Sequence, residues 1–114
     1  MRYLIVDDDP VIRKFLVRLL KTTGADCAVA PNHAEAMEHV GLADFDSALV
    51  DVNLGAEDGL DLAVLLRDMH RKLKIVVMSA DPANERRVVE EGLGQLLLKP
   101  FTPDELRQSL HLGP

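Results

Sequence analysis

Short apolar runs alternate along the chain with longer segments in which apolar residues recur every three or four positions. Five runs are short and bounded by turn residues, which is typical of buried strands: residues 2–7, 26–30, 47–51, 74–79 and 95–98. Each is followed by an amphipathic segment that indicates a helix: residues 10–22, 33–41, 59–70, 82–91 and 103–111. The chain is therefore expected to alternate strands and helices from beginning to end.

Residues that favour helix ends support these boundaries. Asp9, Asp81 and Thr102 each precede a proline, a pair that suits the N-cap and the first position of a helix. Asn32 is a further N-cap candidate, and glycines stand at the ends of helical segments at positions 24, 41 and 92. We therefore assign Asp9 to helix capping, which separates its role from that of the two acids before it.

Strands that alternate with helices predict a parallel sheet covered by helices on both faces. Right-handed crossovers and a length of 114 residues favour a flavodoxin-like, doubly wound (βα)5 fold of the α/β class with strand order 2-1-3-4-5. We expect one domain over residues 1–114, without repeats or linkers. In such folds, ligands bind beyond the carboxyl ends of the strands, here between the first and third strands.

Composition and charge narrow the range of functions. A net charge of −6 argues against binding to nucleic-acid phosphates, and one Tyr and three Phe offer little surface for stacking on bases. No apolar stretch approaches the roughly 20 residues that span a bilayer, and acids interrupt the first apolar run as no signal peptide would. The single cysteine, Cys27, suits a reducing compartment and a small core position. We expect a cytoplasmic protein that binds neither nucleic acid nor membrane directly.

Polar side chains gather where the predicted strands end. The first strand ends in Asp7 and Asp8, the third in Asp51 and the fourth in Ser79, while Lys99 follows the fifth. Because the carboxyl ends of parallel strands meet at one edge of a sheet, these side chains from four segments should converge. Taken singly, Ser79 would be a hydroxyl that caps nearby backbone and Lys99 an exposed loop lysine. Their joint placement favours a shared site.

This set of side chains suits phosphoryl chemistry. Crowded carboxylates raise one another's pKa and favour a bound cation. Mg²⁺ prefers oxygen ligands and is typically held by one or two carboxylates and a phosphate, so Asp7 and Asp8 are the predicted metal pair. Asp51 ends an apolar strand, where it could ligate the metal and act as the nucleophile that forms an aspartyl-phosphate. Lys99 and Ser79 would offer an ammonium and a hydroxyl to the phosphoryl oxygens.

Four motifs together resemble the receiver domains of two-component response regulators, the family that includes the chemotaxis response regulator. The motifs are LIVDDDP at 4–10, LVDVNLGAEDG at 49–59, VMSA at 77–80 and LLLKPF at 96–101, and the resemblance covers nearly the whole chain. It implies that Asp51 is the phosphoacceptor and that Asp7, Asp8, Asp51 and the backbone carbonyl of Asn53 hold Mg²⁺. It also implies roles at the phosphoryl group for Ser79 and Lys99, and a cis Lys99-Pro100 bond.

The resemblance further implies the partners of such a domain. The phosphoryl group would come from the phosphohistidine of a sensor histidine kinase or a histidine phosphotransfer protein. A downstream effector protein would respond to the altered conformation, and a homodimer linked to phosphorylation is compatible with this behaviour. The chain would then be a signalling receiver rather than an enzyme, catalysing only its own phosphorylation and dephosphorylation.

The sequence also departs from the family pattern. Leu96 stands where the family usually has Tyr or Phe, and Gly55 where many members have proline. The segment 92–95 (GLGQ) replaces a polar turn, and the last helix has barely two turns before Gly113-Pro114. Because leucine should fit the core equally well in either state, we expect little movement at the last strand on phosphorylation. The response should shift to the loop at residues 80–85.

Two alternatives remain open at this point. A receiver-like module that acts by protein contacts alone, without phosphorylation, would have the same fold. A haloacid-dehalogenase-type phosphatase uses an Asp-x-Asp pattern that Asp7 and Asp9 could mimic, although Asp9-Pro10 leads directly into a helix and no room is left for a cap domain. A flavin or dinucleotide binder is disfavoured, since no glycine-rich phosphate loop follows the first strand.

Overall fold

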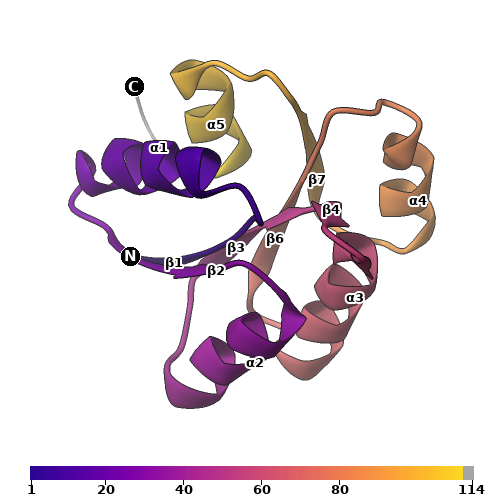
Figure 1. The fold of residues 1–114 in the computed structure, drawn as a ribbon, viewed down its shortest axis with the longest axis horizontal. Helices are drawn as coiled ribbons and strands as arrows, with labels where there is room; N and C mark the ends of the chain where they lie inside the picture. Colours follow the sequence, from indigo (N-terminus) through magenta and orange to yellow (C-terminus); the bar gives the residue numbers. More distant parts are fainter. Residues whose placement is uncertain (112–114) are drawn as a thin grey trace.

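A five-stranded parallel sheet forms the centre of the molecule in the computed structural model, which describes residues 1–111 (Figure 1). The strands are β1 (Arg2–Val6), β2 (Asp26–Ala30), β3 (Ser47–Asp51), β6 (Lys74–Ser79) and β7 (Gln95–Leu98). They lie in the order β2-β1-β3-β6-β7, and every neighbouring pair is parallel. Numbered among these five alone, the order is 2-1-3-4-5, so the predicted fold class is confirmed.

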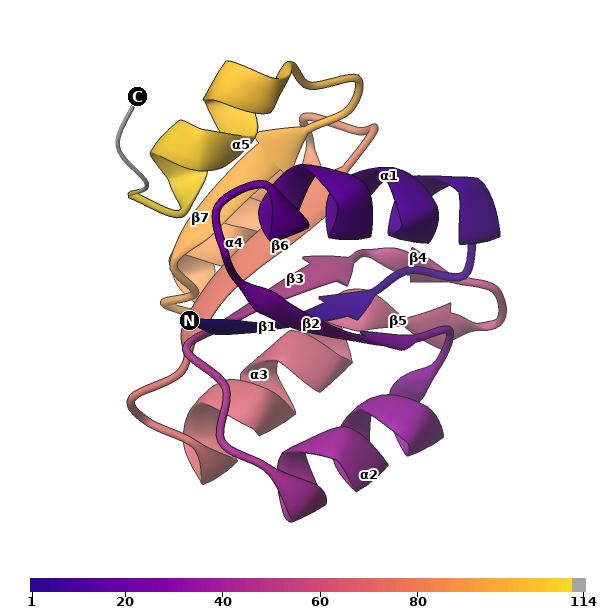
Figure 2. The ribbon, with the colours of Figure 1, turned by 90° about the vertical axis from the view of Figure 1, so that its left-hand side faces the viewer.

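Five helices within residues 1–111 cover the two faces of the sheet. They are α1 (Pro10–Lys21), α2 (His33–Leu42), α3 (Gly59–Met69), α4 (Asn84–Glu90) and α5 (Pro103–Ser109). Helices α1 and α5 lie on one face and α2 and α3 on the other, with α4 beside β7 (Figures 1 and 2). Among the described residues, no helix is both long enough and apolar enough to span a bilayer.

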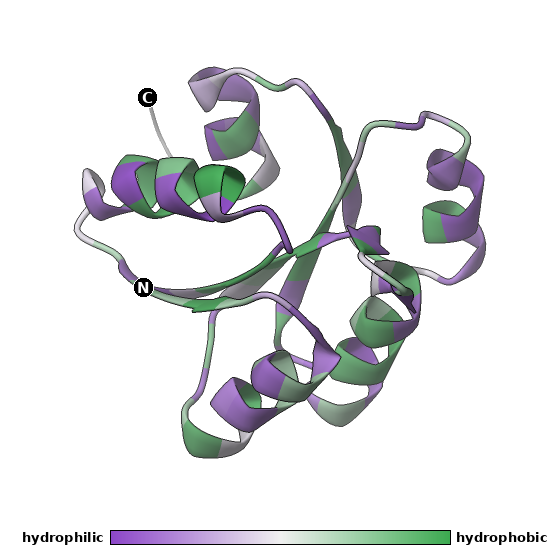
Figure 3. Cartoon of the chain, in the orientation of Figure 1, coloured by the Kyte–Doolittle hydropathy of each residue, from purple (hydrophilic) through white to green (hydrophobic). Residues whose placement is uncertain are grey.

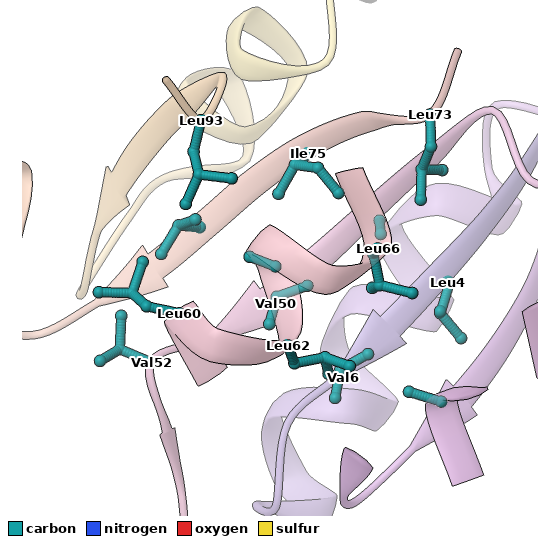
Figure 4. Close-up of a cluster of buried hydrophobic side chains, with 14 of the residues drawn as sticks. Leu4, Val6, Val50, Val52, Leu60, Leu62, Leu66, Leu73, Ile75 and Leu93 are labelled. Carbon is teal, nitrogen blue, oxygen red and sulfur yellow. The ribbon is translucent and has the colours of Figure 1, made fainter. Parts of the chain in front are cut away.

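Each face of the sheet has its own hydrophobic core, because successive strand residues point to opposite sides. Leu4 and Val6 of β1 belong to the core beneath α2, α3 and α4 (Figure 4), whereas Tyr3 and Ile5 belong to the core beneath α1 and α5. Cys27, predicted as a small core residue, is partly buried against the second core. The strands are therefore apolar on both sides, and polar residues lie on the outer helix surfaces (Figure 3).

A small hairpin after β3 was not expected from the sequence. Strands β4 (Asn53–Leu54) and β5 (Glu57–Asp58) pair antiparallel, and Gly55 in the turn between them has a φ of +65°. Glycine adopts this conformation without the steric cost that a side chain would add. Two-residue strands are too short for an alternating hydrophobic pattern, so periodicity could not reveal them.

Several predicted helix boundaries differ from the structure, most clearly at α2 and α4. Helix α2 continues through Gly41 to Leu42, and its C-cap is Ala43. Helix α4 begins at Asn84 rather than at residue 82. The Asp81 side chain does accept a hydrogen bond from the Ala83 backbone at 2.9 Å, but the backbone bonds here span three residues, as in a turn. The Asp81-Pro82 signal thus marks a turn that precedes the helix.

The N-caps of α1 and α5 follow the prediction. Asp9 Oδ1 accepts from the Val11 backbone at 2.9 Å, and Thr102 and Glu105 form a reciprocal capping box. Helix α5 ends at Ser109, two residues earlier than expected. The Gly113-Pro114 end predicted for this segment lies outside the described residues.

Candidate functional site

Strand ends bring the predicted site residues to one edge of the sheet. Asp51 is the last residue of β3, Ser79 is the last of β6, and Asp7 and Lys99 directly follow β1 and β7. Asp7, Asp51 and Ser79 are buried, with exposed fractions of 0%, 5% and 1%. Their positions follow from the strand order, because β1 and β3 are neighbours and β6 lies beside β3.

Lys99 links the two buried carboxylates. Its Nζ donates to Asp7 Oδ2 at 3.0 Å and to Asp51 Oδ2 at 3.1 Å. These contacts join residues 92 and 48 positions apart in the sequence. The peptide bond between Lys99 and Pro100 is cis, as predicted. Lys99, whose side chain is 21% exposed, bonds to two buried carboxylates.

The surroundings shift the pKa values of this cluster. Burial and the charge of Asp7 raise the pKa of Asp51, and hydrogen bonding to Lys99 opposes the rise without cancelling it. Burial would lower the pKa of Lys99, but its hydrogen bonds to Asp7 and Asp51 outweigh this effect and raise it. Lys99 is consequently held in its charged form, and burial makes ionisation of Asp51 less favourable than that of a free aspartate.

A third carboxylate completes an acidic cluster. One oxygen each from Asp7, Asp8 and Asp51 lies within 4.8 Å of the other two, and Asp8 is exposed to solvent. The Lys99 ammonium bonds to two of these three carboxylates, and the Arg13 guanidinium bonds to the Asp7 backbone carbonyl, so negative charge is still in excess in this cluster. Hard divalent cations prefer such oxygen donors, so the residues present are compatible with Mg²⁺.

The acids of the triplet at 7–9 have different surroundings. Asp9 caps α1 with its side chain, while its backbone N–H donates to Asp7 Oδ1 at 2.9 Å. The Arg13 guanidinium donates to the backbone carbonyl of Asp7 at 2.7 Å and so holds the end of β1. The capping role expected of Asp9 is therefore confirmed, and the assignment of Asp7 and Asp8 to a metal stays a prediction.

The loop after Asp51 is fixed by backbone contacts. The Asn53 N–H donates to Asp51 Oδ1 at 3.3 Å. Gly59 begins α3 against this loop, where an added Cβ would lie 1.7 Å from the Asp51 carbonyl oxygen. Only glycine permits this approach, a requirement that the sequence reasoning missed. Its position at the close of the LVDVNLGAEDG motif was the available signal.

Ser79 does not bond to Asp51 in this structure. Its Oγ accepts from the Asp81 backbone at 2.9 Å and from the Asn84 side-chain amide at 2.8 Å, and it donates to the Asp81 carbonyl at 3.1 Å. The hydroxyl therefore lies beside the site but is bonded to the segment that leads into α4. The sequence did not indicate that Asn84 would bond to Ser79 or that Arg13 would bond to Asp7.

Comparison with known proteins assigns the family. The family model described as the response regulator receiver domain matches residues 3–111. The sensor histidine kinase RcsC of Salmonella typhi is 33% identical over 112 residues, and the transcriptional regulatory protein PrrA of Mycobacterium tuberculosis is 34% identical over 107 residues. These alignments cover 96% and 92% of this chain but only 12% and 46% of the two relatives. The chain thus spans less than half the length of either protein.

Solved structures agree with this assignment. The response regulator TrrA of Thermotoga maritima, in complex with Mg²⁺ and BeF, has a TM-score of 0.88 at 26% identity and covers 96% of each chain. A response regulator of Burkholderia pseudomallei with a phosphorylated aspartic acid and a calcium ion has a TM-score of 0.88 at 30% identity, covering 96% of this chain and 65% of its own. This chain therefore belongs to the family of response regulator receiver domains, the phosphoacceptors of two-component signalling.

Proposed function

We propose that Asp51 is the phosphoacceptor of this receiver and that residues 1–114 act as one receiver domain. The observation that carries the proposal is the buried Asp51 carboxylate at the end of β3, bonded to Lys99 at 3.1 Å and grouped with Asp7 and Asp8. A carboxylate in such surroundings is costly unless it has a task. Nucleophilic attack on phosphorus is a task that suits it.

In the proposed reaction, an Asp51 oxygen attacks the phosphorus of a phosphohistidine. The new O–P bond forms as the P–N bond breaks, and the histidine of the partner leaves with the electron pair of that bond. Lys99 offers its charge, and Ser79 its hydroxyl, to the oxygens of the transferred group. Later attack of water on the phosphorus would break this O–P bond, release inorganic phosphate and restore the carboxylate. The chain would catalyse only these steps on itself.

Mg²⁺ would be held by Asp7, Asp8, Asp51 and the backbone carbonyl of Asn53. When bound, it supplies positive charge that screens the carboxylates from the incoming phosphoryl oxygens. The TrrA structure in complex with Mg²⁺ and BeF supports this assignment by similarity. The excess negative charge of the cluster is the supporting feature of this chain itself.

The proposed donor is a sensor histidine kinase or a histidine phosphotransfer protein, and the proposed recipient of the signal is a downstream effector. The similarity to a receiver segment within RcsC and to the regulator PrrA supports partners of these classes. A cytoplasmic location and a phosphorylation-linked homodimer remain predictions. The rival function is a receiver-like module that works without phosphorylation.

Incubation with acetyl phosphate and Mg²⁺ distinguishes these functions. Intact-mass measurement should show one added phosphoryl group on the wild type and none on Asp51→Ala. Asp8→Ala should lose most of the label together with Mg²⁺ binding. Asp9→Ala should keep both and lose about 0.5–2 kcal/mol of stability through the missing cap. A wild type that gains no mass under these conditions would favour the phosphorylation-independent module.

A further inference from the structure

The Ser79 hydroxyl has no free hydrogen-bonding capacity. A hydroxyl offers one proton and two lone pairs. Here the proton goes to the Asp81 carbonyl, while the lone pairs accept from the Asp81 backbone N–H and the Asn84 amide. Together with the bond to Cβ, these contacts occupy all four directions around the oxygen. Ser79 cannot turn its proton toward a new acceptor unless at least one contact breaks.

Of the three hydrogen bonds to the Ser79 hydroxyl, the one from Asn84 connects β6 to a helix. Asp81 lies two residues from Ser79, so its bonds belong to a local turn, whereas Asn84 is the first residue of α4. The neighbouring Ala83 at the N-cap forms no side-chain cap. The partly buried Asn84 side chain instead reaches back to the end of β6.

The surroundings of Asn84 also face the loop after Asp51. Asn84 lines a polar cavity of about 380 Å³ together with Asn53, Asp58 and Arg87. Across this cavity, Arg87 of α4 pairs with Asp58 of β5 at 2.9 Å. The start of α4 is therefore bound to the end of β6 through Asn84 and to the β4–β5 hairpin through Arg87.

We infer that Asn84 is a positioning residue that holds the Ser79 hydroxyl toward α4 and away from the phosphorylation site. This inference rests on the proposed function of Asp51. A phosphoryl oxygen on Asp51 would compete with the Asp81 carbonyl for the single Ser79 proton. Turning the Ser79 side chain so that its proton meets that oxygen moves Oγ out of its present contacts, the one from Asn84 included. Phosphorylation and the attachment of α4 to β6 therefore oppose each other.

The consequence is a coupling between the site and α4. Helix α4 has seven residues and buries only Val88 among them, so few other contacts restrain its first turn. Loss of the Asn84 bond should loosen residues 80–85, the loop where the sequence already places the response. Conversely, removal of the Asn84 amide should make the phosphorylated arrangement easier to reach.

Beryllofluoride, a phosphoryl mimic, tests this coupling on the intact chain. In the presence of Mg²⁺, its affinity can be followed by NMR titration for the wild type, Asn84→Ala and Glu85→Ala. Asn84→Ala should bind about two- to tenfold more tightly, the range that corresponds to one net hydrogen bond. Glu85→Ala is the matched control, because it truncates the adjacent exposed residue of the same turn, whose side chain has no hydrogen bond among the described residues.

A double-mutant cycle separates positioning of Ser79 from a general loosening of α4. In a Ser79→Ala background, Asn84→Ala should no longer change beryllofluoride affinity, and Ser79→Ala alone should shift the Asn84 side-chain amide signals of the free protein. Unchanged or weaker binding by Asn84→Ala, or a gain that persists without Ser79, would overturn the inference. If the wild type binds no beryllofluoride, or Asp51→Ala binds it equally well, the proposed function fails and the inference fails with it.

Discussion

Each end of the central sheet carries a partly buried lysine, and the two lysines have opposite surroundings. At the carboxyl end, Lys99 bonds to Asp7 and Asp51, and its pKa is raised. At the amino end, Lys74 begins β6 with its Nζ shielded from solvent and without a hydrogen-bond partner among the described residues. Burial lowers the pKa of Lys74. Hydrogen-bond partners thus offset the effect of burial on the pKa of Lys99, and Lys74 has none among the described residues.

Removal of Lys99 is expected to have the largest effect on stability. Lys99→Met leaves two buried carboxylates facing each other without a cation, which should cost about 2–3 kcal/mol at neutral pH, somewhat less than a fully enclosed pair. The loss should shrink as pH falls through the raised folded pKa of Asp51, because that carboxylate then takes up a proton. Urea unfolding at pH 7 and pH 4 would measure it. Added Mg²⁺ should restore part of the lost stability. Equal unfolding curves for the variant and the wild type would contradict a stabilising role for the contacts of Lys99 with the two carboxylates.

Removal of Lys74 should act in the other direction. Lys74→Met keeps the length of the side chain and removes an ammonium that has no partner, so stability should rise by about 1–2 kcal/mol. The lowered pKa means that the folded chain binds this proton less well than the unfolded chain does. The gain should therefore be present at neutral pH and disappear above about pH 10, where lysine in the unfolded chain loses its proton. A loss of stability at pH 7 would show that Lys74 has a partner in solution.

Replacement of Asp51 by a neutral isostere should have the smallest effect of the three. Because the folded pKa of Asp51 is raised, its contribution to stability is full below the unfolded value of about 3.9 and is lost as pH rises through the folded value. Asp51→Asn should therefore be more stable than the wild type at pH 7, by less than either lysine substitution changes stability, and equal to it below the unfolded pKa. The same unfolding series would detect this. Greater stability of the wild type at pH 7 without Mg²⁺ would contradict the raised pKa.

These contrasts also show what the sequence could reveal. Asp7, Asp51 and Lys99 were found because each stands directly at the end of an apolar strand, and a parallel sheet brings such ends together. The sequence placed Lys99 at the phosphoryl group. It could not show that one ammonium would bond to both carboxylates, since this depends on side-chain geometry across 92 and 48 residues.

Local competition explains what the sequence analysis missed. Asp81-Pro82 has residue types typical of a helix start. Its hydrogen bonds instead form a turn, and α4 begins only at Asn84. Ser79 was given two readings, as a hydroxyl that caps backbone and as a donor to the phosphoryl group. Its bonds to Asp81 match the first reading, while its place at the end of β6 suits the second. Hydrogen bonds between a loop and a helix start leave no periodic signal.

The central claim is that Asp51, among three neighbouring carboxylates, receives the phosphoryl group. An acyl phosphate is reduced by borohydride to an alcohol, which converts the modified aspartate to homoserine and marks it permanently. Peptide mass mapping after treatment with acetyl phosphate, Mg²⁺ and borohydride would then identify the position. We expect homoserine at position 51 alone. Homoserine at position 7 or 8, with residue 51 unmodified, would contradict the account.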